Sequence, residues 1–321
     1  MIFAFLLGSC FCWEEEPMII AMEIAFRQIG DNAHTTVKKV LQMNHENLIR
    51  DSIIGAWINS IEKPPSNTYT FNHWRFTRTP INRNLPDESI TMHENLDDLQ
   101  AQLKEFDDSL YRSSILQPWP YTVAFKSYFG LVGDVYSPLH NAELFDERFP
   151  EGDNCGRNFF IKYNGKNISL YDFWETGCGR FTKSLPYSDD DWKEIDKLAD
   201  QLREEIPYTS FKDASTSFEI IGEESKNIAN QTVYSIQYNQ ELKDDDEYVK
   251  QCKEITTQRI VFAAYKISVQ LKKFNVPSFP EKAPEQPVGS SEIVAWAAFS
   301  LLLPAFIFSV WKYLSDKIKF D

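Results

Sequence analysis

The segment at residues 130–140, near the middle of the chain, strongly limits what this chain can fold into. It reads GLVGDVYSPLH and completes a strongly apolar stretch that starts at residue 123. This composition predicts a helix over residues 123–136, and Ser137-Pro138 predicts its end. The segment therefore places a carboxylate, Asp134, inside an apolar helix and an imidazole, His140, just beyond it.

Other segments show apolar residues at helical spacing and predict a mainly helical chain. The predicted helices cover residues 18–29, 35–43, 45–61, 96–110, 189–205, 217–237 and 244–274. Ser188 followed by Asp191 predicts the N-terminal cap of one of them. Residues 158–169 alternate and contain Asn164-Gly165, which predicts a β-hairpin. With 43% hydrophobic residues in 321, we expect one large all-α domain with a small hairpin.

The segment at residues 130–140 resembles the zinc-binding motif of the class I nucleases. These are zinc-dependent single-strand nucleases and 3'-nucleotidases of the S-one/P-one type, in which the motif reads His-x-x-Gly-Asp-x-His-x-Pro-Leu-His. The residues in register here are Gly133, Asp134, Pro138, Leu139 and His140. The family's first histidine falls on Gly130 and its middle histidine on Tyr136.

Segments upstream resemble the same family and follow its order along the chain. WEEEPMIIAMEIA resembles the family's mature N-terminus, with Trp13 at the tryptophan. Met18, or Pro17 in a shifted alignment, stands at the histidine that follows. GAWINSI places Asn59 at an aspartate position, and HWRF places Arg75 at a histidine position.

A downstream segment at residues 156–177 completes the resemblance. It reads GRNFFIKYNGKNISLYDFWETG and resembles the family's strand and turn followed by Asn-Leu-His-x-x-Trp-Asp. Asn158 and Trp174 match, Tyr171 stands at a histidine ligand, and Glu175 replaces the aspartate. The resemblance covers about residues 13–179.

This resemblance implies the fold of zinc-dependent phospholipase C and the class I nucleases over residues 13–276. It also implies hydrolysis of nucleic acid at a trinuclear zinc centre, with Asp134 at a catalytic position. Trp13, Asp134 and His140 match the family's metal ligands, and Glu175 is a conservative substitute. The other ligand positions carry residues that bind zinc poorly or not at all, namely Met18, Asn59, Arg75, Gly130 and Tyr171.

Arg75 has the strongest consequence, because a guanidinium is permanently charged and repels a metal ion. We expect it to form an ion pair with Asp134. We therefore expect no metal, or at most one divalent ion, which is zinc if the family activity is retained. His140 and Glu175, with Asp134 or Asp172, are the candidates for a single site. The alternative is that these buried groups only make structural hydrogen bonds.

Two functions remain open from the sequence. The first is a degenerate homologue that binds single-stranded nucleic acid, a nucleotide or a protein without cleaving it. The second is an active nuclease or 3'-nucleotidase with one rewired metal. The formal charge of −14 argues against a protein that coats nucleic acid, but a nuclease whose metals supply positive charge is compatible with it.

Both ends of the chain predict a secretory route. Residues 1–12 predict a signal peptide cleaved before Trp13, although a truncated gene start or a buried strand is an alternative. Residues 293–311 lack charges and predict a transmembrane helix rather than a buried core helix. Prolines predict a stalk over residues 277–292, and lysines predict a cytoplasmic tail over 312–321. We expect a single-pass type I membrane protein of the secretory pathway or cell surface.

Cysteines and glycosylation sequons fit that route. Cys155 and Cys178 bracket the downstream motif, so we expect a disulfide between them in an oxidising compartment. Cys252 is then left over as a free and buried thiol. Sequons predict N-linked glycans at Asn167 and Asn230.

Overall fold

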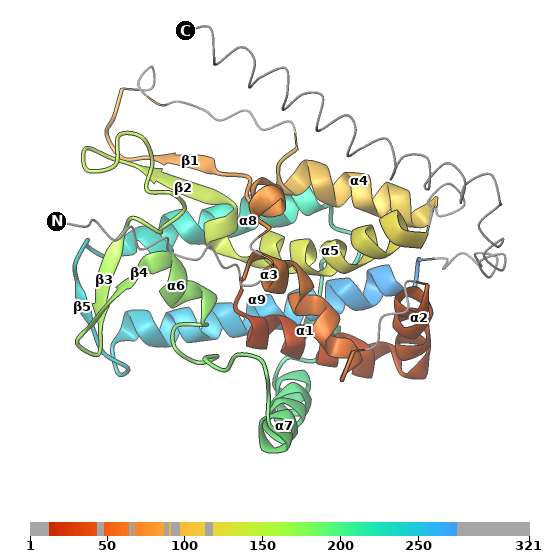
Figure 1. The fold of residues 1–321 in the computed structure, drawn as a ribbon. Helices are drawn as coiled ribbons and strands as arrows, with labels where there is room; N and C mark the ends of the chain where they lie inside the picture. Colours follow the sequence, from red (N-terminus) through yellow and green to blue (C-terminus); the bar gives the residue numbers. More distant parts are fainter. Residues whose placement is uncertain are drawn as a thin grey trace, which may run out of the picture. The chain divides into compact units, whose positions relative to one another are not determined.

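A computed structural model describes residues 13–43, 48–63, 66, 68–86, 90, 97–112 and 118–274. Helices dominate these residues (Figure 1). The α-helices are α1 (Glu15–Ile29), α2 (Asp31–Gln42), α3 (Trp57–Glu62), α4 (Leu99–Tyr111), α5 (Pro118–Tyr136), α6 (Leu170–Glu175), α7 (Asp189–Glu205), α8 (Phe218–Gln231) and α9 (Glu247–Leu271). Short 3-10 helices are η1 (Asp51–Ala56), η2 (Tyr69–Arg75), η5 (Pro138–His140), η6 (Tyr208–Ser210) and η7 (Val233–Ser235).

Helix α5 lies at the centre of the core (Figure 1). It packs against α3, α4, α8 and α9, while α1 packs against α7 and α9. Because α5 contacts helices on several sides, its C-terminal half is buried all round, as its apolar composition requires. Asp134 is buried with it and must therefore find its partners inside the protein.

Two small sheets flank the helices. The first pairs β1 (Thr79–Asn82) in parallel with β2 (Ala142–Phe145), with Thr79 opposite Ala142. Just before this ladder, the backbone N–H of Thr77 donates to the carbonyl of His140 at 2.8 Å. The sheet therefore holds the chain after Arg75 against the chain after His140.

The second sheet contains the predicted hairpin. Strands β3 (Phe160–Tyr163) and β4 (Lys166–Ser169) pair antiparallel, and β5 (Glu241–Leu242) pairs in parallel with β3. Asn164 and Gly165 both have positive φ, as a two-residue hairpin turn requires. The predicted hairpin is confirmed, whereas β1, β2 and β5 were not predicted from the sequence.

Most predicted helices are confirmed, and α7 matches its prediction at both ends. Ser188 and Asp191 form the predicted capping box at its start. The prediction of one continuous helix over residues 45–61 is wrong, because residues 51–56 form the 3-10 helix η1 and the α-helix α3 begins only after it. The helix predicted over 217–237 stops at Gln231, where β-branched Thr232 and Val233 follow.

The predicted Cys155 to Cys178 disulfide is wrong. Cys178 pairs instead with Cys252, 74 residues further along the chain, and Cys155 is a free buried thiol. All three cysteines lie in one hydrophobic cluster, and α9 brings Cys252 to a Cα distance of 6.1 Å from Cys178. Sequence spacing does not reveal which cysteine a distant helix presents.

The predicted signal peptide at residues 1–12 lies outside the described residues, and so do the stalk at 277–292, the span at 293–311 and the tail at 312–321. Within the described ranges, no helix combines the length and the apolar character that crossing a membrane requires.

Candidate functional site

Five residues at the family's ligand positions come from four different elements. Arg75 ends η2, Asp134 lies in the last turn of α5, and His140 ends η5. Tyr171 and Glu175 belong to α6. Direct contacts connect these five side chains into one cluster, and each is at most 1% exposed. The fold thus brings together the positions that the sequence motifs separate.

Arg75 lies at the centre of this cluster. Its Nε donates to Oδ2 of Asp134 at 2.9 Å, and its Nη2 lies 3.3 Å from Oδ1. Its Nη1 donates to Oε2 of Glu62 at 3.0 Å, and Nη2 also donates to Oδ1 of Asn59 at 2.7 Å. The predicted Arg75 to Asp134 ion pair is present, and the guanidinium lies where the motif requires a metal ligand.

The charges around Arg75 are not fully balanced by it. Burial raises the pKa of Asp134, and the permanent charge of Arg75 acts in the opposite direction. Burial, with the like charge of Asp134, raises the pKa of Glu62 to about 8. Arg75 is thus one cation beside two carboxyl groups. Because Glu62 mainly holds its proton near pH 7, this part of the cluster is close to neutral.

His140 is a neutral imidazole with both ring nitrogens engaged. Its Nδ1 lies 2.6 Å from the carbonyl oxygen of Arg75, which requires a proton on Nδ1. Its Nε2 then accepts a hydrogen bond from the hydroxyl of Tyr171 at 3.0 Å. Burial lowers the pKa of His140 to about 3. The lone pair that would bind a metal is therefore occupied by a phenol.

Phe76 and Arg157 fix the ring planes of this pair. His140 stacks on Phe76 at a centroid distance of 4.3 Å and an interplanar angle of 11°. The guanidinium of Arg157 lies 3.9 Å from the ring centroid of Tyr171. These contacts orient Tyr171 toward His140 and do not leave either ring free to turn away.

Glu175 completes the cluster on the side of α6. Its Oε1 accepts a hydrogen bond from the hydroxyl of Ser137 at 2.7 Å, and its Oε2 lies 3.7 Å from Nε2 of His140. Burial raises the pKa of Glu175 to about 8. The carboxyl group is therefore mainly protonated at neutral pH, and a metal bound here would have to displace this proton.

Trp13 and Asn59 form hydrogen bonds where the family uses main-chain and aspartate ligands. The side-chain amide of Asn59 donates to the carbonyl oxygen of Trp13 at 2.6 Å. The indole of Trp13 donates to the carbonyl of Gly133 at 3.0 Å. The Trp13 carbonyl is thus occupied by Asn59, which also binds Arg75.

Met18 and Gly130 have become packing positions. A Cβ added to Gly133 would lie 2.3 Å from Sδ of Met18, so this thioether fills the space against α5. A Cβ added to Gly130 would lie 2.4 Å from Cγ2 of Ile58. A histidine at residue 130 would therefore clash with α3 unless the helices moved apart.

The residues present do not fit a zinc centre. Among the described residues, no group of three or more His, Cys, Asp or Glu side chains is arranged to hold a metal ion. The single-metal candidates are also occupied, since Asp134 pairs with Arg75 and His140 with Tyr171. Asp172 lies in the first turn of α6, where its backbone N–H is capped by Ser169.

Glu62, the second carboxylate beside Arg75, was not among the residues predicted from the sequence. It lies three residues after Asn59 on α3, so both side chains lie on one face of that helix. That spacing was readable in the sequence, but the short helix itself was predicted as part of a longer one. Cys155 and the sequons Asn167 and Asn230 lie outside the cluster, and both asparagines are exposed.

Comparison with known proteins identifies the family of this chain. A search of curated proteins found no match. The family model of the S1/P1 nucleases matches residues 13–275, which is most of the chain and includes every residue of the cluster. The chain therefore belongs to the S1/P1 nuclease family.

Proposed function

We propose that this chain is a member of the S1/P1 nuclease family that binds its ligand without cleaving it. The observation that carries this proposal is the buried guanidinium of Arg75, hydrogen-bonded to Asp134, Glu62 and Asn59. It supplies internally the positive charge that metal ions supply in zinc hydrolases. Nucleic acid or a nucleotide is the ligand class that family membership favours.

The chemistry of the cluster supports the loss of hydrolysis. Phosphodiester hydrolysis at zinc requires an acidified water and positive charge beside the phosphate. Here the cation is already paired, His140 is neutral and hydrogen-bonded, and Glu175 is mainly protonated at pH 7. No group of this cluster is placed to take a proton from water. The side chains are also buried, so a phosphate has no direct access to them.

The alternative is an active enzyme with one rewired metal. Glu175 and His140 favour it to a limited extent, because Oε2 of Glu175 and Nε2 of His140 face each other at 3.7 Å. Such a metal would have to displace the Tyr171 hydroxyl and the proton of Glu175. It would also lie close to Arg75, which repels it.

Hydrolysis assays on the purified full chain separate the two. We expect no EDTA-sensitive cleavage of single-stranded DNA, RNA or 3'-AMP. EDTA-sensitive cleavage that is lost in both Asp134→Ala and His140→Ala would overturn the proposal. The two variants also control for contaminating nucleases, because cleavage by a contaminant would persist in both of them.

We also propose that the domain is anchored in a membrane of the secretory pathway or cell surface. The signal-like residues 1–12, the uncharged residues 293–311 and the lysine-bearing tail support this topology. Protease added outside sealed microsomes should then spare the domain, and detergent should expose it. Digestion of the domain without detergent would contradict a lumenal location.

A further inference from the structure

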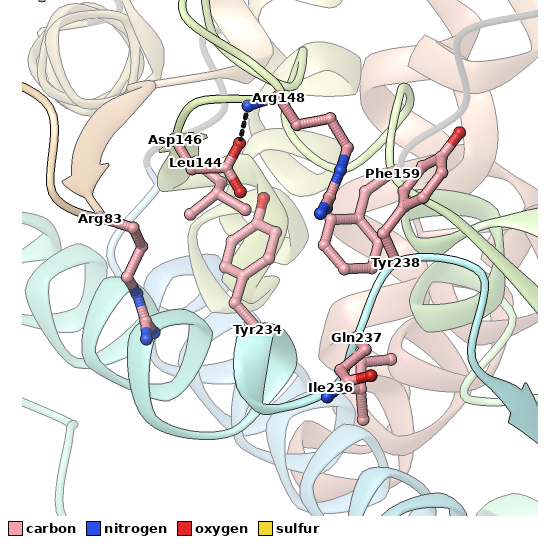
Figure 2. Close-up of a pocket in the computed structure, with 9 residues that line it drawn as sticks. All are labelled: Arg83, Leu144, Asp146, Arg148, Phe159, Tyr234, Ile236, Gln237 and Tyr238. Carbon is pink, nitrogen blue, oxygen red and sulfur yellow. Dashed lines mark hydrogen bonds between the residues drawn. The ribbon is translucent and has the colours of Figure 1, made fainter.

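A pocket lies outside the candidate site (Figure 2). Its volume is about 400 Å³, which lies within the usual range for small-molecule sites. The chain around β2 and the turn after α8 supply most of its walls, and the pocket shares no residue with the Arg75 cluster. It is lined by Arg83, Leu144, Asp146, Arg148, Phe159, Tyr234, Ile236, Gln237 and Tyr238.

Two arginines give this pocket positive charge. Arg83 uses Nη2 to donate to the backbone and side-chain oxygens of Asn230, at 3.0 and 3.2 Å. Arg148 holds its guanidinium over the ring of Tyr238, 4.8 Å from the centroid. Within the described part of the chain, neither guanidinium pairs with a carboxylate. Unpaired arginines stand out in a chain with a formal charge of −14.

Asp146 does not cancel this charge through an ion pair. Its Oδ1 accepts the backbone N–H groups of Arg148 and Phe149, at 2.8 and 2.9 Å. The carboxylate therefore shapes the turn that presents Arg148 (Figure 2). With two arginines and one aspartate, the lining keeps a net positive formal charge.

Aromatic rings form the apolar part of the lining. Phe159 and Tyr238 contact each other edge to face, with centroids 5.6 Å apart. Phe159 also contacts Tyr234 at 5.9 Å. Such rings pack against flat ligands with little loss of conformational entropy. The amide of Gln237 adds both a donor and an acceptor at the exposed side.

We propose that this pocket binds a small ligand that carries an anionic group and a flat ring. Arg83 and Arg148 bind the anion, because guanidinium matches phosphate and carboxylate geometry. Tyr238, which is partly exposed, packs against the ring, and the buried Phe159 supports Tyr238 through their edge-to-face contact. This inference goes beyond the loss of catalysis and does not rest on it, since a metal-loaded enzyme would contain the same pocket.

Calorimetric titration of the purified full chain tests the proposal. The probes are 5'-AMP and phenylacetate, which combine a ring with an anion, and inorganic phosphate and adenosine, which carry only one of the two. We expect 5'-AMP or phenylacetate to bind at least about tenfold more tightly than inorganic phosphate and adenosine. No binding of either combined probe up to about 10 mM would overturn the proposal, and so would equal affinity for phosphate alone.

Variants then assign the binding to this pocket. Arg148→Gln and Arg83→Gln should each lower the affinity for the bound probe by about tenfold or more. The affinity of Arg148→Lys should lie between those of Arg148→Gln and the native chain. Arg203→Gln, on α7, is the matched control and should leave affinity unchanged. Unchanged affinity in both pocket variants would overturn the assignment. These results do not depend on zinc content or hydrolysis, so each proposal can fail alone.

Discussion

The guanidinium of Arg75 and the carboxylate of Asp134 form a buried ion pair, with Nε and Oδ2 2.9 Å apart. In the family motif these two positions belong to metal ligands, one a histidine and one an aspartate. A cation on one of them neutralises the carboxylate on the other without any metal. Arg75 thereby balances the charge of Asp134 inside the protein, which supports the proposed loss of the metal centre.

Arg75→Met should strongly destabilise the protein. The substitution removes the cation that contacts both Asp134 and Glu62 and leaves the buried carboxylate of Asp134 without its paired charge. Breaking such a pair typically costs about 3–5 kcal/mol. Urea unfolding of the full chain measures the change. Arg203→Met is the control, since its ion pair with Asp200 lies on the surface and should contribute less than about 1 kcal/mol. A loss below about 1 kcal/mol for Arg75→Met would contradict the role given to this residue.

Asp153 should make stability fall as pH rises through the mildly acidic range. Burial raises the pKa of Asp153 from 3.8 to about 6, with the N–H of Leu144 opposing it. The folded state therefore binds the proton more tightly than the unfolded state. The resulting stabilisation is complete below pH 3.8 and is lost as pH rises through about 6.

Comparison with Asp153→Asn isolates this effect. Between pH 4 and pH 7 the unfolding free energy of the native chain should fall by roughly 2 kcal/mol relative to the variant. The asparagine keeps an acceptor for the Leu144 N–H and does not titrate. A difference that stays constant with pH, or that grows in favour of the native chain, would show that Asp153 does not titrate in this range.

The Cys178 to Cys252 disulfide should be found by peptide mapping under non-reducing conditions. Closing a loop of this length should stabilise the fold by about 4 kcal/mol in the chain-entropy treatment. Cys252→Ala should therefore lower stability, while Cys155→Ala should keep the linkage and serve as the control. Recovery of a Cys155 to Cys178 peptide would reject this pairing.

Asn167 and Asn230 should carry N-linked glycans if the domain enters the secretory pathway. Both side chains are exposed, on β4 and near the end of α8. Thr232→Ala removes the second sequon and keeps the Asn230 oxygen that Arg83 binds. Glycosidase treatment should shift the native chain by two steps on a gel and Thr232→Ala by one. A native chain without any shift would count against the secretory route.

The elements that sequence predicted well are those specified locally. Asn164-Gly165 specified the hairpin through its backbone preference, and Ser188 with Asp191 specified the start of α7. The family register also anticipated the Arg75 to Asp134 pair, because it assigns both positions to one metal centre. In each case a short segment or a known register contains the whole signal.

The features that were missed depend on segments far apart in the chain. Cys252 pairs with Cys178 only because α9 packs beside the loop after α6, and spacing gave no sign of this. The parallel pairing of β1 with β2 likewise joins segments some sixty residues apart. Tyr171 was judged only as a poor zinc ligand, whereas its hydroxyl has a definite role as the partner of His140.

Zinc content per chain tests the central claim most directly. The full chain, produced in zinc-supplemented medium and dialysed without chelator, can be measured by elemental mass spectrometry against its protein concentration. The buried guanidinium of Arg75 predicts well below one tightly bound zinc per chain. One or more zinc ions per chain that are lost in His140→Ala would contradict the account.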